Sequence, residues 1–417
     1  MAAASPSASD PAPSDASGPG FAAPIYLDHL ATTPLDPRVL EVMLPCLREN
    51  FGNPSSRTHD FGYAAAAAVE AARAHVAHLI SATAREIIFT SGATEANNLA
   101  LKGICEAWSG SGMHLVTCVT EHHAVLDVFQ RLERAGHRVT RLAVDSTGIL
   151  DLDALDAALD DGARLLSVMA ANNETGVLQP LDEIAARLRG RDVVWHCDAA
   201  QAAGKVPLDM RRLPIDLLSI SAHKIHGPKG QGALFVRRRR PPLRLTPQIE
   251  GGGQERGLRS GTLNVAGIVG FGEACRLASD ESEADAERLR RLRDSLQERL
   301  TDALGTTVVI NGHRSQRLPH ALNVSFPGIH GADLITALRD VALSSGSACA
   351  SGDGTPSHVL TALGLDPATA AASLRFGLGR STTAMEVERA AARVICEVTA
   401  LQAQVAELRS CGKSGRP

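Results

Sequence analysis

Between residues 34 and 275, short apolar runs alternate with stretches of helical periodicity, and this alternation limits the folds open to the chain. Strands that alternate with helices are typical of a mainly parallel sheet covered by helices. The periodicity also predicts amphipathic helices over 63–79 and 181–188. We therefore predict a large α/β domain over 34–275 with a mainly parallel, seven-stranded sheet. The predicted strands cover residues 86–90, 114–120, 138–143, 165–170, 193–197, 217–221 and 233–237.

The pattern changes near residue 275, where a long charged helix is predicted over 274–304. A helix of this kind commonly joins two domains. Beyond it, short strands at 321–326 and 373–377 and helices at 332–339 and 384–408 indicate a smaller α+β domain. The predicted division is a disordered tail over 1–24, the large domain over 34–275, the small domain over 25–33 and 276–410, and a short tail over 411–417.

Charge and composition exclude several classes of partner. A formal net charge of −4 gives no reason to expect nucleic acid or an anionic membrane surface. No apolar run approaches the roughly 18 residues that a membrane helix needs. The first 24 residues carry no lysine or arginine, so they match neither a secretory signal nor a transit peptide. We expect a cytoplasmic protein.

The eight cysteines contain no Cys-x-x-Cys pair and no zinc spacing, and the chain has no His-Glu-x-x-His sequence. We therefore predict no metal site. Most of the cysteines lie in apolar patterns, where a thiol behaves as a small hydrophobic group. Cys349 is different, because it lies in a run of small residues, 344–354, that is typical of a mobile loop.

Lys224 is one of only five lysines in a chain with 42 basic residues. It follows the predicted strand 217–221, at the point where an apolar run ends in glycine and proline. Arginine cannot form a Schiff base, whereas lysine can once it has lost its proton. A chain that uses arginine nearly everywhere else keeps a lysine here, so we identify Lys224 as a candidate for holding pyridoxal phosphate.

Polar residues follow other predicted strands, and in an open parallel sheet the carboxyl ends of the strands line the ligand crevice. The sequence 91–97 follows one strand, and its small residues and hydroxyls favour either a phosphate cradle or an ordinary helix cap. His122 follows the next strand and is a candidate catalytic residue, either stacked on a cofactor ring or relaying protons, or else an ordinary surface or cap residue. Asp198 ends a buried strand, and its partner is either a pyridinium nitrogen or the amides of a helix start.

Two further groups complete the candidate site. Ser221 and His223 flank Lys224 and have hydrogen-bond donors suited to a phosphate. Arg375 lies in the predicted small domain, where its planar fork suits a carboxylate. An isolated arginine is more commonly part of a surface ion pair, so both interpretations of Arg375 stay open.

Taken together, these segments resemble cysteine desulfurases of the NifS/IscS type, within the fold-type I PLP-dependent transferases. The similarity runs from about residue 25 to the final predicted helix. The motifs that carry it are Tyr26-Leu-Asp-His-Leu-Ala-Thr-Thr-Pro34, Phe51-Gly-Asn-Pro-Ser55, Phe89-Thr-Ser-Gly-Ala-Thr-Glu95, Thr120-Glu-His122, Asn172-Asn-Glu-Thr-Gly176, Asp198-Ala-Ala-Gln201, Ser221-Ala-His-Lys224, Gly251-Gly-Gly-Gln-Glu-Arg256, Arg259-Ser-Gly-Thr262 and Ser345-Gly-Ser-Ala-Cys349. His29 and Leu30 depart from the family, whose members often have an aromatic or a small polar residue there.

The resemblance implies a role for each matching residue. Lys224 is similar to the Schiff-base lysine, Asp198 to the partner of the pyridine nitrogen, and His122 to the histidine stacked on the ring. The resemblance implies Arg375 as the anchor of the substrate carboxylate and Cys349 as the nucleophile. The other implied contacts are Gln201 and Asn173 near the ring oxygen, Asn173 also near the substrate, and Ala93, Thr94, Ser221, His223 and, from the other subunit of a homodimer, Thr262 at the phosphate.

The resemblance also implies an activity. L-cysteine would be converted to L-alanine, with a persulfide left on Cys349 and passed to a sulfur acceptor for iron–sulfur cluster assembly or for thiolation of tRNA or a cofactor. Three alternatives stay open from the sequence. A selenocysteine lyase would use the same fold and cofactor, an aminotransferase would need no loop cysteine, and a scaffold would keep the fold without catalysis.

Overall fold

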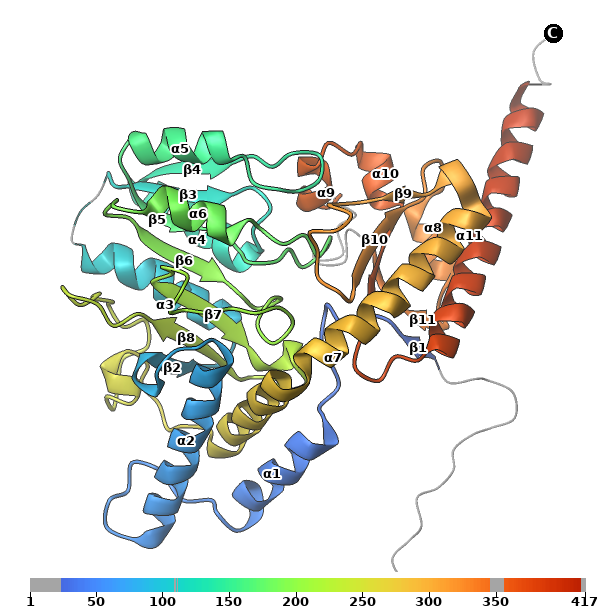
Figure 1. The fold of residues 1–417 in the computed structure, drawn as a ribbon. Helices are drawn as coiled ribbons and strands as arrows, with labels where there is room; N and C mark the ends of the chain where they lie inside the picture. The colour runs from blue at the N-terminus through green and yellow to red at the C-terminus, as the bar shows by residue number, and fades with distance from the viewer. Residues whose placement is uncertain (1–23, 109, 111, 346–355, 414–417) are drawn as a thin grey trace, which may run out of the picture.

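The computed structural model describes residues 24–108, 110, 112–345 and 356–413, and in it two sheets lie on either side of one long helix, α7 (Val265–Leu304) (Figure 1). The larger sheet is built from the first part of the chain and the smaller one from the last part. The chain's N-terminal segment crosses between them, because β1 (Ile25–Tyr26) pairs with β11 (Val341–Ala342) beside the smaller sheet.

The larger sheet has seven strands in the order β2-β8-β7-β6-β5-β3-β4. Neighbours from β7 to β4 are parallel, whereas β8 is antiparallel to both β2 and β7. All seven predicted strands are present to within three residues of their predicted starts and ends, and the mainly parallel sheet is confirmed. The strands are β2 (Ile87–Thr90), β3 (His114–Cys118), β4 (Arg138–Leu142), β5 (Ala163–Ser167), β6 (Val194–Asp198), β7 (Leu217–Ser221) and β8 (Gly232–Val236).

Both faces of this sheet are covered, so its central strands are buried throughout. Every residue of β3, β6 and β7 is buried, as expected of parallel strands between helices. Alternate side chains of the strands pack against α3 (Ala93–Ala107) and α4 (His123–Arg134) on one face. The opposite face packs against α2 (Asp60–Leu79), α5 (Leu152–Asp160), α6 (Leu181–Leu188) and the first half of α7. Helix α1 (Pro37–Arg48) and the short turns η1 (Ala84–Glu86), η2 (Ala222–Lys224) and η3 (Glu255–Gly257) complete this region.

The smaller sheet is antiparallel, in the order β12-β13-β10-β9. It has its own hydrophobic core, which includes the second half of α7. None of the helices in the described part of the chain combines the length and apolarity needed to cross a membrane. The elements are β9 (Val309–Ile310), β10 (Ala321–Ser325), β12 (Ser344–Ser345) and β13 (Ser373–Gly377), with η4 (Gly305–Thr307), α8 (Gly331–Ala337), α9 (His358–Ala362), α10 (Pro367–Ala371) and α11 (Ala384–Lys413).

Two predicted helix boundaries were wrong. Helix α7 begins at Val265 rather than near residue 274, because Asn264 caps it by accepting a hydrogen bond from the Gly267 amide at 3.1 Å. Its glycine-rich start has poor helix propensity, but a Cβ at Gly272 would lie 2.6 Å from the backbone of Ala72, so glycine allows a close approach to α2. Helix α11 continues through Lys413, so residues 411–413 of the predicted tail are helical.

Candidate active site

A cavity of about 560 Å³ lies at the carboxyl ends of the central strands of the larger sheet. Its lining contains ten of the twelve residues that the sequence analysis singled out. Thr262 is exposed and does not line this cavity, and Cys349 lies outside the described residues. The ten are Ala93, Thr94, His122, Asn173, Asp198, Gln201, Ser221, His223, Lys224 and Arg375.

Lys224 lies on η2, directly after β7, and its side chain reaches the N-terminal segment of the chain. The Nζ atom donates hydrogen bonds to the carbonyl oxygens of Leu30 at 2.6 Å and Ala31 at 2.8 Å. Gln201 donates to the same Leu30 carbonyl at 2.9 Å. Residues 30 and 31 thus hold the amine of Lys224 at the wall of the cavity.

Asp198 ends β6 and is 5% exposed. One carboxylate oxygen accepts a hydrogen bond from the Asn97 side chain at 2.7 Å, and the other accepts from the Ala200 amide at 2.9 Å. The sequence suggested a helix cap here, but the residues after Asp198 form turns, and the contact with Ala200 closes a turn instead. Asn97 was not assigned a role there, because nothing local to residue 97 shows that it meets a residue 101 positions away.

Glu121 is a second carboxyl group near Asp198, and it is wholly buried. One of its oxygens accepts from the Met169 amide at 2.5 Å, and the other has no partner among the described residues. Burial, and then the charge of Asp198, raise the pKa of Glu121 well above its ordinary value. Burial therefore favours the neutral form of Glu121 over a second negative charge beside Asp198.

His122 has the helix-capping role considered for it, and its place in the cavity lining leaves stacking on a cofactor as a prediction. It caps α4 by accepting a hydrogen bond from the Ala124 amide at Nδ1, at 3.0 Å, and its ring lines the cavity. Because Nδ1 is the acceptor, the proton of the neutral ring is on Nε2. Burial is the main reason that the pKa of His122 is lowered, so the ring is neutral near pH 7.

The start of α3 forms one end of the cavity, where β2 and β7 end. A Cβ at Gly232 would lie 2.5 Å from the Cα atom of Gly92, so only glycine lets these two segments meet. Ser221, His223 and Thr94 line the cavity at the same end of the sheet. Burial, and then the charges of Lys224 and Lys229, lower the pKa of His223 to about 4. A helix start of this kind suits an anion, because its first amides have no partner within the helix.

Arg375 lies on β13 of the smaller sheet and is 3% exposed, which rules out the surface ion pair. Its guanidinium donates to the carbonyl of Asn173 at 3.0 Å, to Asp28 at 2.9 Å and to the hydroxyl of Ser344 at 2.9 Å. A fixed guanidinium therefore faces the cavity from the side opposite the larger sheet. Asp28 was quoted in a motif but was not predicted to contact Arg375.

The comparisons with known proteins agree with this geometry. A model of the family aminotransferase class-V matches residues 25–390. The cysteine desulfurase IscS of Anaeromyxobacter sp. (strain Fw109-5) is 52% identical over 379 residues, which cover 91% of this chain and 93% of that protein. The cysteine desulfurase IscS of Methylococcus capsulatus is 52% identical over 386 residues, covering 93% of each.

Solved structures of similar proteins agree with these sequence matches. A NifS-like protein superposes with a TM-score of 0.84 at 36% identity, covering 91% of this chain and 100% of that chain. DndA from Streptomyces lividans has a TM-score of 0.72 at 40% identity, covering 84% of this chain and 99% of that one. The matched segment includes every cavity residue described above, and we conclude that this chain belongs to the aminotransferase class-V family.

Proposed function

We propose that this protein is a cysteine desulfurase, which converts L-cysteine to L-alanine and takes the sulfur as a persulfide on Cys349. The observation that carries the proposal is the meeting of Lys224, Asp198 and Arg375 around one cavity. An amine, a buried carboxylate and a guanidinium are the groups needed to handle an amino acid on pyridoxal phosphate. Relatives that are 52% identical over 91% or more of this chain are cysteine desulfurases by name.

The residues present fit pyridoxal phosphate. The amine of Lys224 suits the aldehyde carbon, and the carboxylate of Asp198 suits a protonated pyridine nitrogen. The cradle where Gly92 and Gly232 meet would be filled by any larger side chain, and it suits the phosphate together with Ala93, Thr94, Ser221 and His223. When bound, the cofactor supplies an electron sink that stabilises negative charge at the α-carbon of the amino acid.

Asp198 would be the charged partner of the cofactor's pyridine nitrogen, and Glu121 is the carboxyl group near it. Asp198 presents a carboxylate that is fixed from both sides by Asn97 and by the Ala200 amide. The raised pKa of Glu121 favours its neutral form, which would let Asp198 pair with a cation without a competing charge. His122 forms one face of the cavity, where a flat neutral ring suits stacking. Gln201 and Asn173 would contact the ring-oxygen side.

Lys224 and Arg375 hold the substrate between the two sheets. The guanidinium of Arg375 would bind the α-carboxylate of L-cysteine, with Asn173 beside it. Lys224 would then remove the α-proton at Nζ and return a proton to the product. Because one group comes from the larger sheet and the other from the smaller, their separation decides whether the substrate is correctly oriented.

Cys349 would be the sulfur acceptor within the protein. Its thiolate attacks the sulfur of the substrate, a sulfur–sulfur bond forms, and the bond between Cβ and sulfur of the substrate breaks. The electron pair of that bond stays with the carbon, which takes up a proton as L-alanine forms. This assignment is supported by the match of Ser345-Gly-Ser-Ala-Cys349 to the family motif, since residue 349 lies outside the described residues.

We also propose that the protein acts as a homodimer, in which Thr262 reaches the phosphate site of the other subunit. Support comes from aromatic side chains that are exposed beside the loop of Thr262. Phe51 is 69% exposed, its ring stacks on that of Phe61 at 5.5 Å, and Tyr63 lines a groove with Gly252 and neighbouring residues. A second copy covering this face would bury them. An iron–sulfur scaffold or another sulfur-acceptor protein would then receive the sulfur of the persulfide. We propose a cytoplasmic location for the protein.

The test is to load the purified protein with pyridoxal phosphate, supply L-cysteine and a dithiol, and measure alanine and sulfide. Equal amounts of both are expected. Cys349→Ser should keep the visible absorbance of the cofactor but release no sulfide. If a protein with bound cofactor formed no alanine from L-cysteine, or if Cys349→Ser released sulfide at the wild-type rate, the proposal would be wrong. Running L-selenocysteine in parallel measures the preference between the two substrates.

A further inference from the structure

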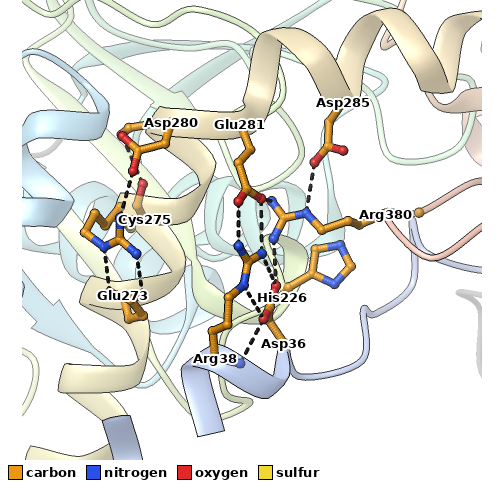
Figure 2. Close-up of polar contacts among 12 residues, drawn as sticks. Asp36, Arg38, His226, Glu273, Cys275, Asp280, Glu281, Asp285 and Arg380 are labelled. Atoms are coloured by element: carbon orange, nitrogen blue, oxygen red, sulfur yellow. Dashed lines mark hydrogen bonds and ion pairs between the residues drawn. The ribbon is translucent and has the colours of Figure 1, made fainter. Parts of the chain in front are cut away.

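Arg380 lies on the connection between β13 and α11, and it makes ion pairs with two other parts of the chain (Figure 2). It donates to Asp36 at 2.8 Å and to Asp285 at 2.9 Å, and its third nitrogen is 3.4 Å from Glu281. Asp36 caps α1, whereas Glu281 and Asp285 lie on α7. The guanidinium of Arg380 therefore links the smaller sheet, the long helix and the N-terminal segment.

A second arginine strengthens the junction at Asp36. Arg38 donates to both oxygens of Asp36, at 3.0 and 2.8 Å, and to both oxygens of Glu281, at 2.5 and 3.1 Å. Asp36 is 7% exposed, and its hydrogen bonds, first with Arg38 and then with Arg380, hold the pKa of its carboxyl below the ordinary value. The carboxylate of Asp36 is thus ionised and fixed on both sides.

Asp36 ends a segment, residues 28–36, that is hydrogen-bonded to the loop of Lys224. The Asp36 amide donates to the carbonyl of His226 at 3.0 Å. The hydroxyl of Thr33 donates to the carbonyl of His223 at 2.8 Å and accepts from the His226 amide at 2.8 Å. Within the same segment, the carbonyls of residues 30 and 31 hold Nζ of Lys224. Any shift of residues 28–36 would therefore move the amine.

The two ends of this segment are held by arginines five positions apart. Asp28, at one end, pairs with Arg375 at 2.9 Å, and Asp36, at the other, pairs with Arg380 at 2.8 Å. Next to Asp28, the Gly377 amide donates to the carbonyl of Leu27 at 2.7 Å, so the backbone joins β13 there as well. A segment fixed at both ends to the same strand and the loop after it cannot move independently of Arg375.

We propose that Arg380 is a positioning residue, which fixes residues 28–36 and through them sets the position of the Lys224 amine relative to Arg375. The inference rests on the proposed function, because it assigns Lys224 and Arg375 to the two ends of one substrate. Arg380 itself does not line the active-site cavity. It would act only through the geometry of the groups that do.

Arg276 provides a matched control. It also has two carboxylate partners, Glu273 at 2.7 Å and Asp280 at 2.8 Å, but all three residues lie on α7 itself. Arg276→Gln removes two ion pairs without separating the two halves of the site. An effect shared by both arginine variants would reflect lost ion pairs, and an effect confined to Arg380→Gln would reflect positioning.

The first measurement is amide hydrogen exchange in the cofactor-free protein. In Arg380→Gln, exchange at residues 28–36 and 223–226 should rise at least about 10-fold, and in Arg276→Gln it should stay at the wild-type rate. In the loaded enzyme, kcat/KM for L-cysteine should fall about 10²-fold, as expected when reacting groups are displaced by about 1 Å. Arg380→Lys keeps the charge but loses the fork, and it should recover only part of this loss.

Unchanged exchange at residues 28–36, or a loss of kcat/KM equal to that of Arg276→Gln, would overturn the proposal. If Arg380→Gln does not fold, Glu281→Gln weakens the same junction from α7 and should show the same local pattern at smaller size, and a wild-type pattern there would overturn the proposal equally. A wild-type enzyme that forms no alanine would instead contradict the proposed function, while the exchange comparison in the cofactor-free protein would still test Arg380.

Discussion

Lys224 and Lys205 both lie in the region of the larger sheet, and each lines a cavity. The two cavities differ greatly in size. The cavity of Lys224 has a volume of about 560 Å³, whereas that of Lys205 has about 20 Å³. The first is large enough for a cofactor and a substrate, and the second has room for about one water molecule. A lysine in an unusual environment therefore marks a site for chemistry only where there is space for a second reactant.

The cavity of Lys205 nevertheless has several features of an active site. It is lined by His226, His320, Asp285 and Arg380, and the first two are 5% and 1% exposed. Burial lowers the pKa of His226 to about 3, and Nδ1 of His320 has no hydrogen-bond partner among the described residues. Shifted pKa values are common in active sites, but here they follow from burial at the junction of the two sheets.

The largest expected effect comes from removing Lys224. Lys224→Ala should abolish the visible absorbance of the lysine-bound cofactor and lower alanine formation by at least about 10³-fold, since the α-proton loses its acceptor. Lys205→Met should keep both the absorbance and the activity. Absorbance spectra and alanine release measure the two effects. A Lys205→Met protein that loses the cofactor would break the distinction drawn between the two cavities.

A second large effect is expected from changing Asp198. Asp198→Asn removes the carboxylate but keeps the shape of the side chain, so the cofactor should still bind while kcat falls by about 10² to 10³-fold. Asn97→Ala removes one of the two groups that hold Asp198 and should cost less, because the Ala200 amide remains. Stopped-flow absorbance and steady-state kinetics separate binding from turnover. An Asp198→Asn enzyme with wild-type kcat would exclude the proposed role.

The sequence predicted the residues that line the large cavity much better than the residues that hold them in place. Lys224, Asp198 and His122 follow predicted strands, and the rule that strand ends line the crevice brought them together. Asn97, Asp28 and Arg380 act through contacts 101 or more positions away in the sequence, and no local pattern reveals such contacts. The glycine-rich start of α7 was missed for the same reason, since its helix depends on packing against α2.

The buried histidines predict an acid-labile fold. The pKa of His29 is lowered to about 4 and that of His226 to about 3, in both cases mainly by burial. The unfolded chain therefore binds more protons than the folded protein between about pH 4 and 6.5. Stability from these groups is complete above pH 6.5 and is lost as the pH falls, at about 1.4 kcal/mol per pH unit for each histidine.

Denaturant unfolding at pH 7.5, 6 and 5 checks this expectation. In His226→Gln, the fall in the free energy of unfolding between pH 6 and 5 should be smaller by about 1.4 kcal/mol than in the wild type. The ring of His226 lies 6.0 Å from that of His29, and the substitution leaves His29 in place. A pH dependence identical to that of the wild type would show that His226 takes up its proton in the folded protein as readily as in the unfolded chain.

The smallest expected effect is that of Lys205 on stability. Burial is the main reason that the pKa of Lys205 is lowered to about 8, so below that pH the folded protein holds a charged amine at a cost that the unfolded chain does not have. The unfolded chain binds more protons between about pH 8 and 10.5, and the cost therefore disappears as the pH rises through this range.

Lys205→Met should raise the free energy of unfolding at pH 7 by about 1 kcal/mol, after allowance for partial exposure of the side chain to water. Asp285 would keep its ion pair with Arg380 at 2.9 Å, so the substitution leaves no carboxylate unpaired there. Thermal or denaturant unfolding at pH 7 and at pH 10 measures the gain, and a gain that is absent at pH 7 or equal at both pH values would mean that Lys205 is as well solvated in the folded protein as in the unfolded chain.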